Sequence, residues 1–131
     1  MIDRDRLRRW TLLAVLAQIA VRAVAGGVAL VVDPTGGLVG RSTTGLAALP
    51  IADFRVPGLV LAVGIGGGAL LAQVAVWRRW PRAWQAASAV GIGLLAWIGL
   101  ELALGYGGPT VPLNLGTGVA VVALAVADRS L

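Results

Sequence analysis

Two charged side chains lie inside long apolar runs, and their placement is the strongest indication of chemistry in this chain. Glu101 is the only charged residue of residues 83–106, and Arg22 lies within the apolar run of residues 10–32, four positions after Gln18. A charge inside about 20 apolar residues is costly unless it is paired, protonated or facing a cavity. Gln18 and Arg22 share a helix face because of their spacing. We therefore interpret Gln18, Arg22 and Glu101 as a polar site within a membrane.

Helix geometry brings the two charges to similar depths. At 1.5 Å per residue, Arg22 lies about 18 Å beyond Trp10 and Glu101 about 25 Å beyond Trp84, so their depths differ by about 7 Å. A long arginine side chain can reach over that distance. One interpretation is a structural Arg22–Glu101 ion pair that fixes the helix arrangement. Another is a functional site, open to the outer side, that binds a cation, a proton or a polar headgroup. A third is that each side chain reaches water separately.

Further residues would complete a functional site at the outer level of the helices. The loop of residues 33–56 would act as its lid. Trp97 would form a wall of the site because it precedes Glu101 by one helical turn. The other candidates share a position near the outer ends of the predicted helices: Asp53, Arg55, Tyr106 and Asn114.

The chain lacks the residues that most enzymes and metal sites require. It contains no cysteine and no histidine, which removes thiolate chemistry, the usual general base and the common ligands of zinc and haem. Glu101 has no second carboxylate in the same apolar region, so a carboxylate pair for acid–base chemistry is also missing. We expect no catalytic residue, no metal site and no cofactor.

The composition is that of a membrane protein. Hydrophobic residues make up 58% of the 131 residues and charged residues 13%, and the mean hydropathy is +0.87. A soluble domain of this size needs more polar surface than that. The net charge of +5 would also suit nucleic acid. The positions of the arginines favour membrane topology instead, and we expect no nucleic-acid partner.

Turn-forming residues divide the chain into four apolar segments. Asp33-Pro34 ends the first segment, Pro57-Gly58 opens the second, and Pro112 suits the first turn of the fourth. A signal peptide is the competing interpretation of the first segment, but its length and its polar residues disagree with it. We predict an all-α membrane protein with one domain over the whole chain. This domain is an antiparallel bundle of four transmembrane helices, at about 10–32, 57–77, 83–105 and 112–127, with a short interfacial segment in the extracytoplasmic loop 33–56.

The distribution of arginine sets the expected orientation. The N-terminal head contains four arginines, the turn at residues 78–82 three and the C-terminal tail one, whereas loop 33–56 contains two and residues 105–111 none. Short loops rich in arginine stay in the cytoplasm. We therefore expect the protein in the plasma (inner) membrane with both termini in the cytoplasm. The tryptophans at the same interface agree with this orientation: Trp10, Trp77, Trp80 and Trp84.

Small residues follow one face of the second segment. Gly64, Gly68 and Ala72 are spaced four positions apart, which allows a neighbouring helix to approach closely. This face either packs inside the bundle or forms an interface between two copies of the chain.

Three short motifs are spread over most of the chain: Asp33-Pro34-x-Gly36, Asp53-Phe54-x-x-Pro57-Gly58, and Trp97-Ile98-x-x-Glu101 followed by Gly105-Tyr106. They resemble motifs of small four-helix integral membrane proteins of actinobacteria and other bacteria. The resemblance implies the four-span architecture and no activity.

These observations give two functional hypotheses. The leading one is a non-catalytic accessory or scaffold subunit that self-associates in the membrane. The alternative is a small oligomeric transporter or channel that uses Arg22 and Glu101. The expected partners are the lipid bilayer and either a second copy of the chain or a larger membrane protein.

Overall fold

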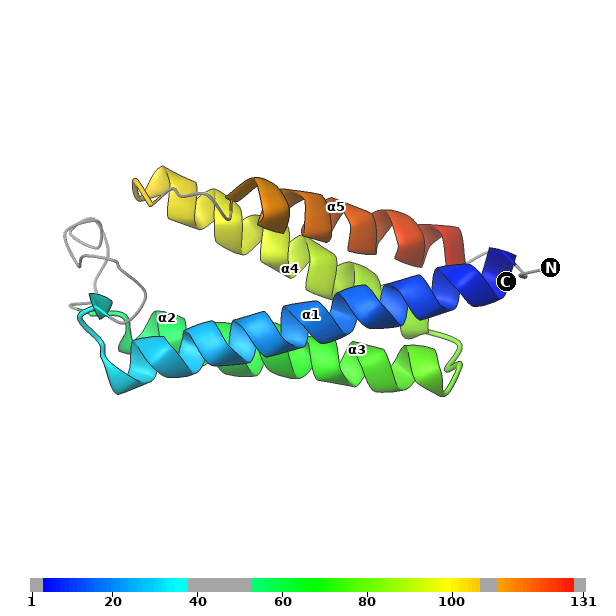
Figure 1. Cartoon of the computed structure of the whole chain (residues 1–131), viewed down its shortest axis with the longest axis horizontal. Coiled ribbons are helices and arrows are strands. Elements are labelled where there is room, and N and C mark those ends of the chain that lie inside the picture. The colour runs from blue at the N-terminus through cyan, green and yellow to red at the C-terminus, as the bar shows by residue number, and fades with distance from the viewer. Residues whose placement is uncertain (1–3, 38–52, 107–110, 129–131) are drawn as a thin grey trace.

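The computed structural model describes residues 4–37, 53–106 and 111–128. These residues form helices and turns and contain no strand. Because α2, η3 and α3 follow one another without a break, the described chain has four helical segments (Figure 1). The predicted all-helical fold with four helices is confirmed. The elements are α1 (Arg4–Val32), α2 (Arg55–Leu59), the π-helix η3 (Val60–Gly66), α3 (Gly67–Trp77), α4 (Ala83–Ala103) and α5 (Val111–Asp128).

Helix α1 begins about six residues earlier than the apolar pattern predicted. The charged head is helical from Arg4 onward, because arginine is a good helix former and no proline interrupts it. The hydroxyl of Thr11 donates to the carbonyl of Leu7 at 2.8 Å within the helix. At the other end, Oδ1 of Asp33 accepts from the backbone N–H and the hydroxyl of Thr35 at 3.2 and 2.6 Å. This turn ends α1 where the sequence predicted.

Helix α1 packs against the second segment through direct backbone contact at two glycines. A Cβ at Gly27 would lie 2.5 Å from the carbonyl oxygen of Gly58, and a Cβ at Gly58 would lie 2.7 Å from that of Gly27. A third position, Gly66, is also crowded, since a Cβ there would lie 2.7 Å from Cγ2 of Val24. Only glycine allows helices to approach this closely. We call α1 together with α2, η3 and α3 the first helix pair.

Helices α4 and α5 form the second helix pair through a similar contact. A Cβ at Gly91 would lie 2.7 Å from Cγ2 of Val122 and 3.0 Å from the carbonyl oxygen of Gly118. A Cβ at Gly118 would lie 2.8 Å from the side chain of Leu95. Figure 1 shows the two helices side by side along their length. Close glycine contacts therefore hold each pair together.

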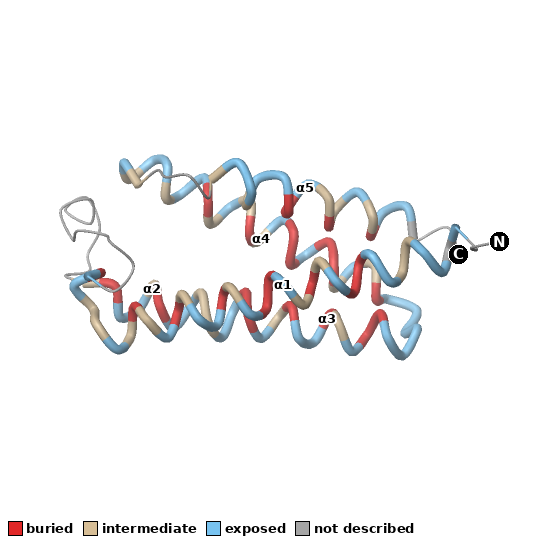
Figure 2. Tube along the Cα trace, viewed as in Figure 1, coloured by how far each residue is buried: buried red, intermediate tan, exposed pale blue. Residues whose placement is uncertain are grey.

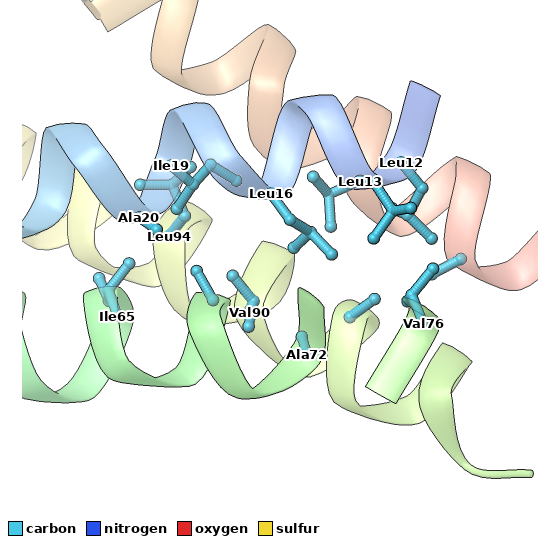
Figure 3. Packing of buried hydrophobic residues seen from close by; sticks show 14 of the residues in the cluster. Leu12, Leu13, Leu16, Ile19, Ala20, Ile65, Ala72, Val76, Val90 and Leu94 are labelled. Carbon is cyan, nitrogen blue, oxygen red and sulfur yellow. The ribbon is translucent and has the colours of Figure 1, made fainter. Parts of the chain in front are cut away.

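The two pairs meet mainly in one half of the molecule, which we call the closed end. It contains the start of α1, the end of α5 and the turn between α3 and α4 (Figure 1). Fully buried side chains from both pairs fill it, including Leu12, Leu16, Ala72 and Ala87. Figure 2 shows buried positions on helices of both pairs, and Figure 3 shows how Leu12, Leu16 and Ala72 lie. We call the opposite half the open end. The two pairs diverge toward it, as the packing of α4 shows: this helix packs against α3 but hardly touches η3.

Arginine and tryptophan side chains connect the helices at the closed end. The rings of Trp10 and Trp77 meet edge to face with their centroids 5.4 Å apart. The guanidinium of Arg9 lies 5.8 Å from the centroid of the Trp77 ring and donates to the Trp77 carbonyl at 3.3 Å. Arg8 donates to the carbonyl of Ala127 at 3.2 Å. Arg9, Trp10 and Trp77, which the sequence assigns to one membrane interface, therefore contact one another in the structure.

Three helical stretches are long and apolar enough to cross a membrane: Arg6–Val32, Arg55–Trp77 and Ala83–Ala103. The fourth apolar stretch, Val111–Ala127, is shorter. The interfacial segment that the sequence predicted in loop 33–56 falls mainly on residues 38–52, which lie outside the described residues.

Candidate functional site

A cleft of about 800 Å³ lies between the two helix pairs at the open end. Residues of α1, α2 and η3 line one side of it, and residues of α4 and α5 line the other. Most of these residues are aliphatic, such as Ile19, Leu30 and Leu94. The volume is typical of ligand pockets and much larger than a packing void. Six of the residues that the sequence singled out line the cleft: Arg22, Gly64, Trp97, Glu101, Tyr106 and Asn114.

Arg22 is held in place from two helices. Its Nη1 donates to Oε1 of Gln18 at 3.1 Å along α1, and its Nη2 donates to Oδ1 of Asn114 on α5. Both acceptors are neutral amides, so they fix the orientation of the guanidinium without balancing its charge. The side chain is half-buried. The cleft therefore has an oriented cationic group in its wall.

Glu101 is oriented within its own helix. The indole Nε1 of Trp97 donates to Oε1 of Glu101 at 2.6 Å, across one turn of α4. Glu101 and Trp97 are both half-buried, and both line the cleft. An N–H bond to a carboxylate is a charge-assisted hydrogen bond, which restricts the rotamer of the side chain that accepts it.

Of the three interpretations of Arg22 and Glu101, the direct ion pair does not match the bonds of the described residues, where the Arg22 guanidinium donates to Gln18 and Asn114. Helix rise gives the depth of a residue along its helix but not the lateral distance between two helices. Helix α4 diverges from α1 and η3 toward the open end, whereas α5 brings Asn114 to Arg22. An amide therefore takes the place expected for the carboxylate, and the two charges line one cleft without pairing with each other.

An aromatic contact joins the two helix pairs at the open end of the cleft. The rings of Phe54 and Tyr106 meet at an interplanar angle of 62° with their centroids 5.6 Å apart. Phe54 is only 4% exposed, and it packs in a small cluster with Leu30 and Leu104. Its backbone N–H donates to the carbonyl of Pro34 at 2.9 Å. Phe54 thus bridges the start of the second segment and the end of α4.

The two charges expected in the lid, Asp53 and Arg55, do not line the cleft. Oδ1 of Asp53 accepts from the backbone N–H of Arg55 at 3.0 Å, where α2 begins, and the Arg55 side chain is exposed. The residue between them, Phe54, is the one that lines the cleft. Sequence reasoning gave Phe54 no place in the site; the available signal was that it is the only phenylalanine of the chain.

The small-residue face of the second segment is directed toward α4 and the cleft. Ala72 is fully buried, and a Cβ at Gly68 would lie 3.7 Å from Cγ2 of Val90 on α4. Gly64 lines the cleft. This placement agrees with internal packing, one of the two alternatives for this face.

The π-helix η3 lies beside the cleft, and sequence reasoning did not predict it. Val60, Leu61, Gly64 and Ile65 belong to η3 and line the cleft. Short π-helical stretches are frequent at functional sites. Apolar periodicity does not distinguish a π-helix from an α-helix, and the only available signal was the glycine-rich stretch of residues 64–68.

The groups that line the cleft are suited to recognition of charge. Within residues 4–37, 53–106 and 111–128, no three His, Cys, Asp or Glu side chains gather to hold a metal ion. A guanidinium remains protonated and donates hydrogen bonds, so Arg22 can bind an anionic group but cannot act as a base. The arrangement offers one cationic contact, one anionic contact and a large aliphatic surface.

Comparison with known proteins found no matching family model, no similar curated protein and no similar solved structure. The resemblance to small four-helix bacterial membrane proteins therefore stays a prediction. The functional interpretation depends on the cleft itself.

Proposed function

We propose that the chain is a multi-pass membrane protein that binds an amphipathic membrane molecule in the cleft and catalyses no reaction. The observation that carries this proposal is the environment of Arg22. Its half-buried guanidinium is held, among the described residues, by the amide oxygens of Gln18 and Asn114, inside a largely aliphatic cleft of about 800 Å³. An oriented charge within an apolar wall matches a ligand with a polar head and an apolar tail.

Membrane insertion of all four segments is part of the proposal. Three stretches have the required length and apolarity. Helix α5 has 18 residues, or about 27 Å at 1.5 Å per residue, close to the thickness of the hydrocarbon core. We infer an antiparallel bundle in a bacterial plasma membrane.

The side chains at the closed end support the predicted orientation. Arg8, Arg9, Trp10 and Trp77 gather there, and basic residues with tryptophan are typical of the cytoplasmic interface. Both termini are then cytoplasmic, and the cleft opens in the outer half of the membrane. Its ligand would come from the outer leaflet.

A transporter or channel that uses Arg22 and Glu101 is the second candidate, because both charges line the cleft. The packing of the closed end favours binding over conduction. Leu12, Leu16 and Ala72 are fully buried there, and a path from the cleft to the other side would have to displace them. Binding requires no such rearrangement.

Self-association as an accessory subunit also stays a prediction. The Gly64–Gly68–Ala72 face is directed toward α4 and the cleft, which favours internal packing over contact with a second copy. A protein that binds an amphiphile can also serve a larger complex, so the two roles are compatible.

Two leucine substitutions on α4 separate the filling of the cleft from effects on the helix. Gly93 lines the cleft and Gly99 does not, and a Cβ at either position would meet no atom within 4 Å. Both substitutions raise helix propensity by a similar amount. Gly93→Leu therefore fills the cleft, and Gly99→Leu is its matched control.

Native mass spectrometry of the purified protein measures the lipid that each variant retains. The probe is a defined mixture of dioleoyl phospholipids with ethanolamine, choline and glycerol headgroups. The wild-type protein and Gly99→Leu should retain a lipid in a fixed ratio to protein, and Gly93→Leu should lose most of it. A wild-type protein without retained lipid, or equal retention by both variants, would refute the proposal.

A further inference from the structure

We propose that the ligand of the cleft is a zwitterionic phospholipid whose phosphate contacts Arg22 and whose ammonium group contacts Glu101. This inference rests on the proposed function and adds the chemical class of the ligand. The observation behind it is that two opposite charges line one cleft without pairing with each other.

The charged residues that line the cleft, within the described part of the chain, are one cation and one anion: Arg22 and Glu101. A purely anionic headgroup would be attracted by Arg22 and repelled by Glu101, and a purely cationic one would meet the reverse. A headgroup that carries one negative and one positive group is attracted by both Arg22 and Glu101. It also adds no net charge to an apolar environment, where an uncompensated charge is costly.

Arg22 retains donors for a phosphate. A guanidinium has five N–H groups, and Gln18 and Asn114 accept from its two Nη atoms, one bond from each. The remaining N–H groups can donate to phosphate oxygens, whose geometry a guanidinium matches well. The two amides keep the guanidinium oriented before the ligand arrives, which lowers the entropic cost of binding.

A carboxylate such as that of Glu101 can accept from an ammonium in addition to its protein partners. One of its oxygens accepts from the indole of Trp97 at 2.6 Å, and a carboxylate offers about four acceptor positions in total. Trp97 and Tyr106 line the same cleft, and aromatic rings attract ammonium groups, whether primary or quaternary. Ethanolamine and choline phospholipids therefore share the chemistry that this site recognises.

The rest of the cleft suits the acyl chains. Val60 and Leu100 line it, and they are 50% and 47% exposed. The aliphatic surface thus continues from the cleft to the outside of the helices. A lipid can place its headgroup between the charges while its chains extend into the surrounding bilayer.

The test measures headgroup preference rather than binding alone. Phospholipids with identical dioleoyl chains and ethanolamine, choline or glycerol headgroups are offered in pairs to the full-length protein in detergent, and native mass spectrometry counts the retained molecules. The wild-type protein should prefer at least one zwitterionic lipid over the glycerol lipid by about tenfold, the effect of one charge-assisted hydrogen bond. The ethanolamine–choline pair then identifies which ammonium group is favoured.

Neutralising each charge should change this preference in opposite directions. Glu101→Gln keeps the side-chain shape and should shift the preference toward the anionic glycerol lipid. Arg22→Gln should weaken binding of all three phospholipids and favour dioleoyl trimethylammonium propane, a cationic amphiphile without phosphate. Arg22→Lys keeps the positive charge and should keep the zwitterion preference. If circular dichroism shows that Arg22→Gln does not fold, the shift expected for Glu101→Gln carries the test.

The outcomes distinguish a wrong ligand class from a wrong function. Equal retention of all headgroups by the wild-type protein, or an unchanged preference in Glu101→Gln, would overturn the zwitterionic ligand and leave the cleft as a binding site. Equal lipid retention by Gly93→Leu and Gly99→Leu would overturn the binding site itself.

Discussion

Replacing Gly27 by alanine should force the helices of the first pair apart. The new Cβ would lie 2.5 Å from the carbonyl oxygen of Gly58 and 2.6 Å from the backbone nitrogen of Ala62. Ordinary contact begins at 3.4 Å, so the helices must separate by about 0.9 Å (3.4 − 2.5). The obstructing atoms belong to the backbone, so no side-chain rotation relieves the clash. Overpacking costs about 1–3 kcal/mol, and the better helix propensity of alanine offsets about 1 kcal/mol of that.

The adjacent glycine provides the control for this substitution. A Cβ at Gly26 would lie 3.5 Å from Cδ2 of Leu61, which is an ordinary contact. Gly26→Ala should therefore stabilise the protein by about 1 kcal/mol through helix propensity alone. Titration of both variants with sodium dodecyl sulfate in mixed micelles, followed by circular dichroism, gives the change in the free energy of unfolding. If the two alanines changed that free energy equally, the close approach of α1 and α2 at Gly27 would be refuted.

Three further substitutions test the site. Asn114→Leu removes an acceptor of Arg22 and leaves a donor of this half-buried residue unsatisfied, so the same titration should show a free energy of unfolding lower by about 1–3 kcal/mol. An unchanged free energy would mean that the Arg22–Asn114 hydrogen bond contributes nothing to stability. Trp97→Phe keeps an aromatic ring but removes the N–H group that Glu101 accepts, so native mass spectrometry should show weaker retention of zwitterionic lipid; equal retention would exclude a role for the indole in positioning the carboxylate. Phe54→Ala removes a buried ring at the open end and should cost about 3–5 kcal/mol while accelerating amide hydrogen exchange at the start of α2. Unchanged exchange would contradict the bridging role of this ring.

The ends of the helices could be predicted because local residues determine them. Pro34, Pro57 and Pro112 lie within two residues of the observed end of α1 and the observed starts of α2 and α5. Proline constrains its own backbone and that of the residue before it, without reference to the rest of the fold. The early start of α1 at Arg4 was not predicted, because an apolar pattern does not report a helical stretch made mainly of charged residues.

The partners inside the site could not be predicted from the chain alone. The cost of a charge in an apolar run identified Arg22 and Glu101, and both line the cleft. Whether Arg22 contacts Glu101 or Asn114 depends on the lateral positions of α4 and α5. Residue spacing along one helix gives no information about those positions. The role of Phe54 depends likewise on where α4 ends relative to the start of α2.

The central claim is that a lipid headgroup contacts Arg22 in the cleft, and solid-state nuclear magnetic resonance can measure that contact. The dipolar coupling between arginine guanidinium ¹⁵N and lipid ³¹P is recorded in bilayers of ethanolamine and glycerol phospholipids. Comparison with Arg22→Lys isolates the signal of Arg22 from that of the arginines at the membrane surface. We expect a component with an N–P distance below about 5 Å that is absent from Arg22→Lys and Gly93→Leu and present in Gly99→Leu. Identical dephasing in all four proteins would contradict the claim.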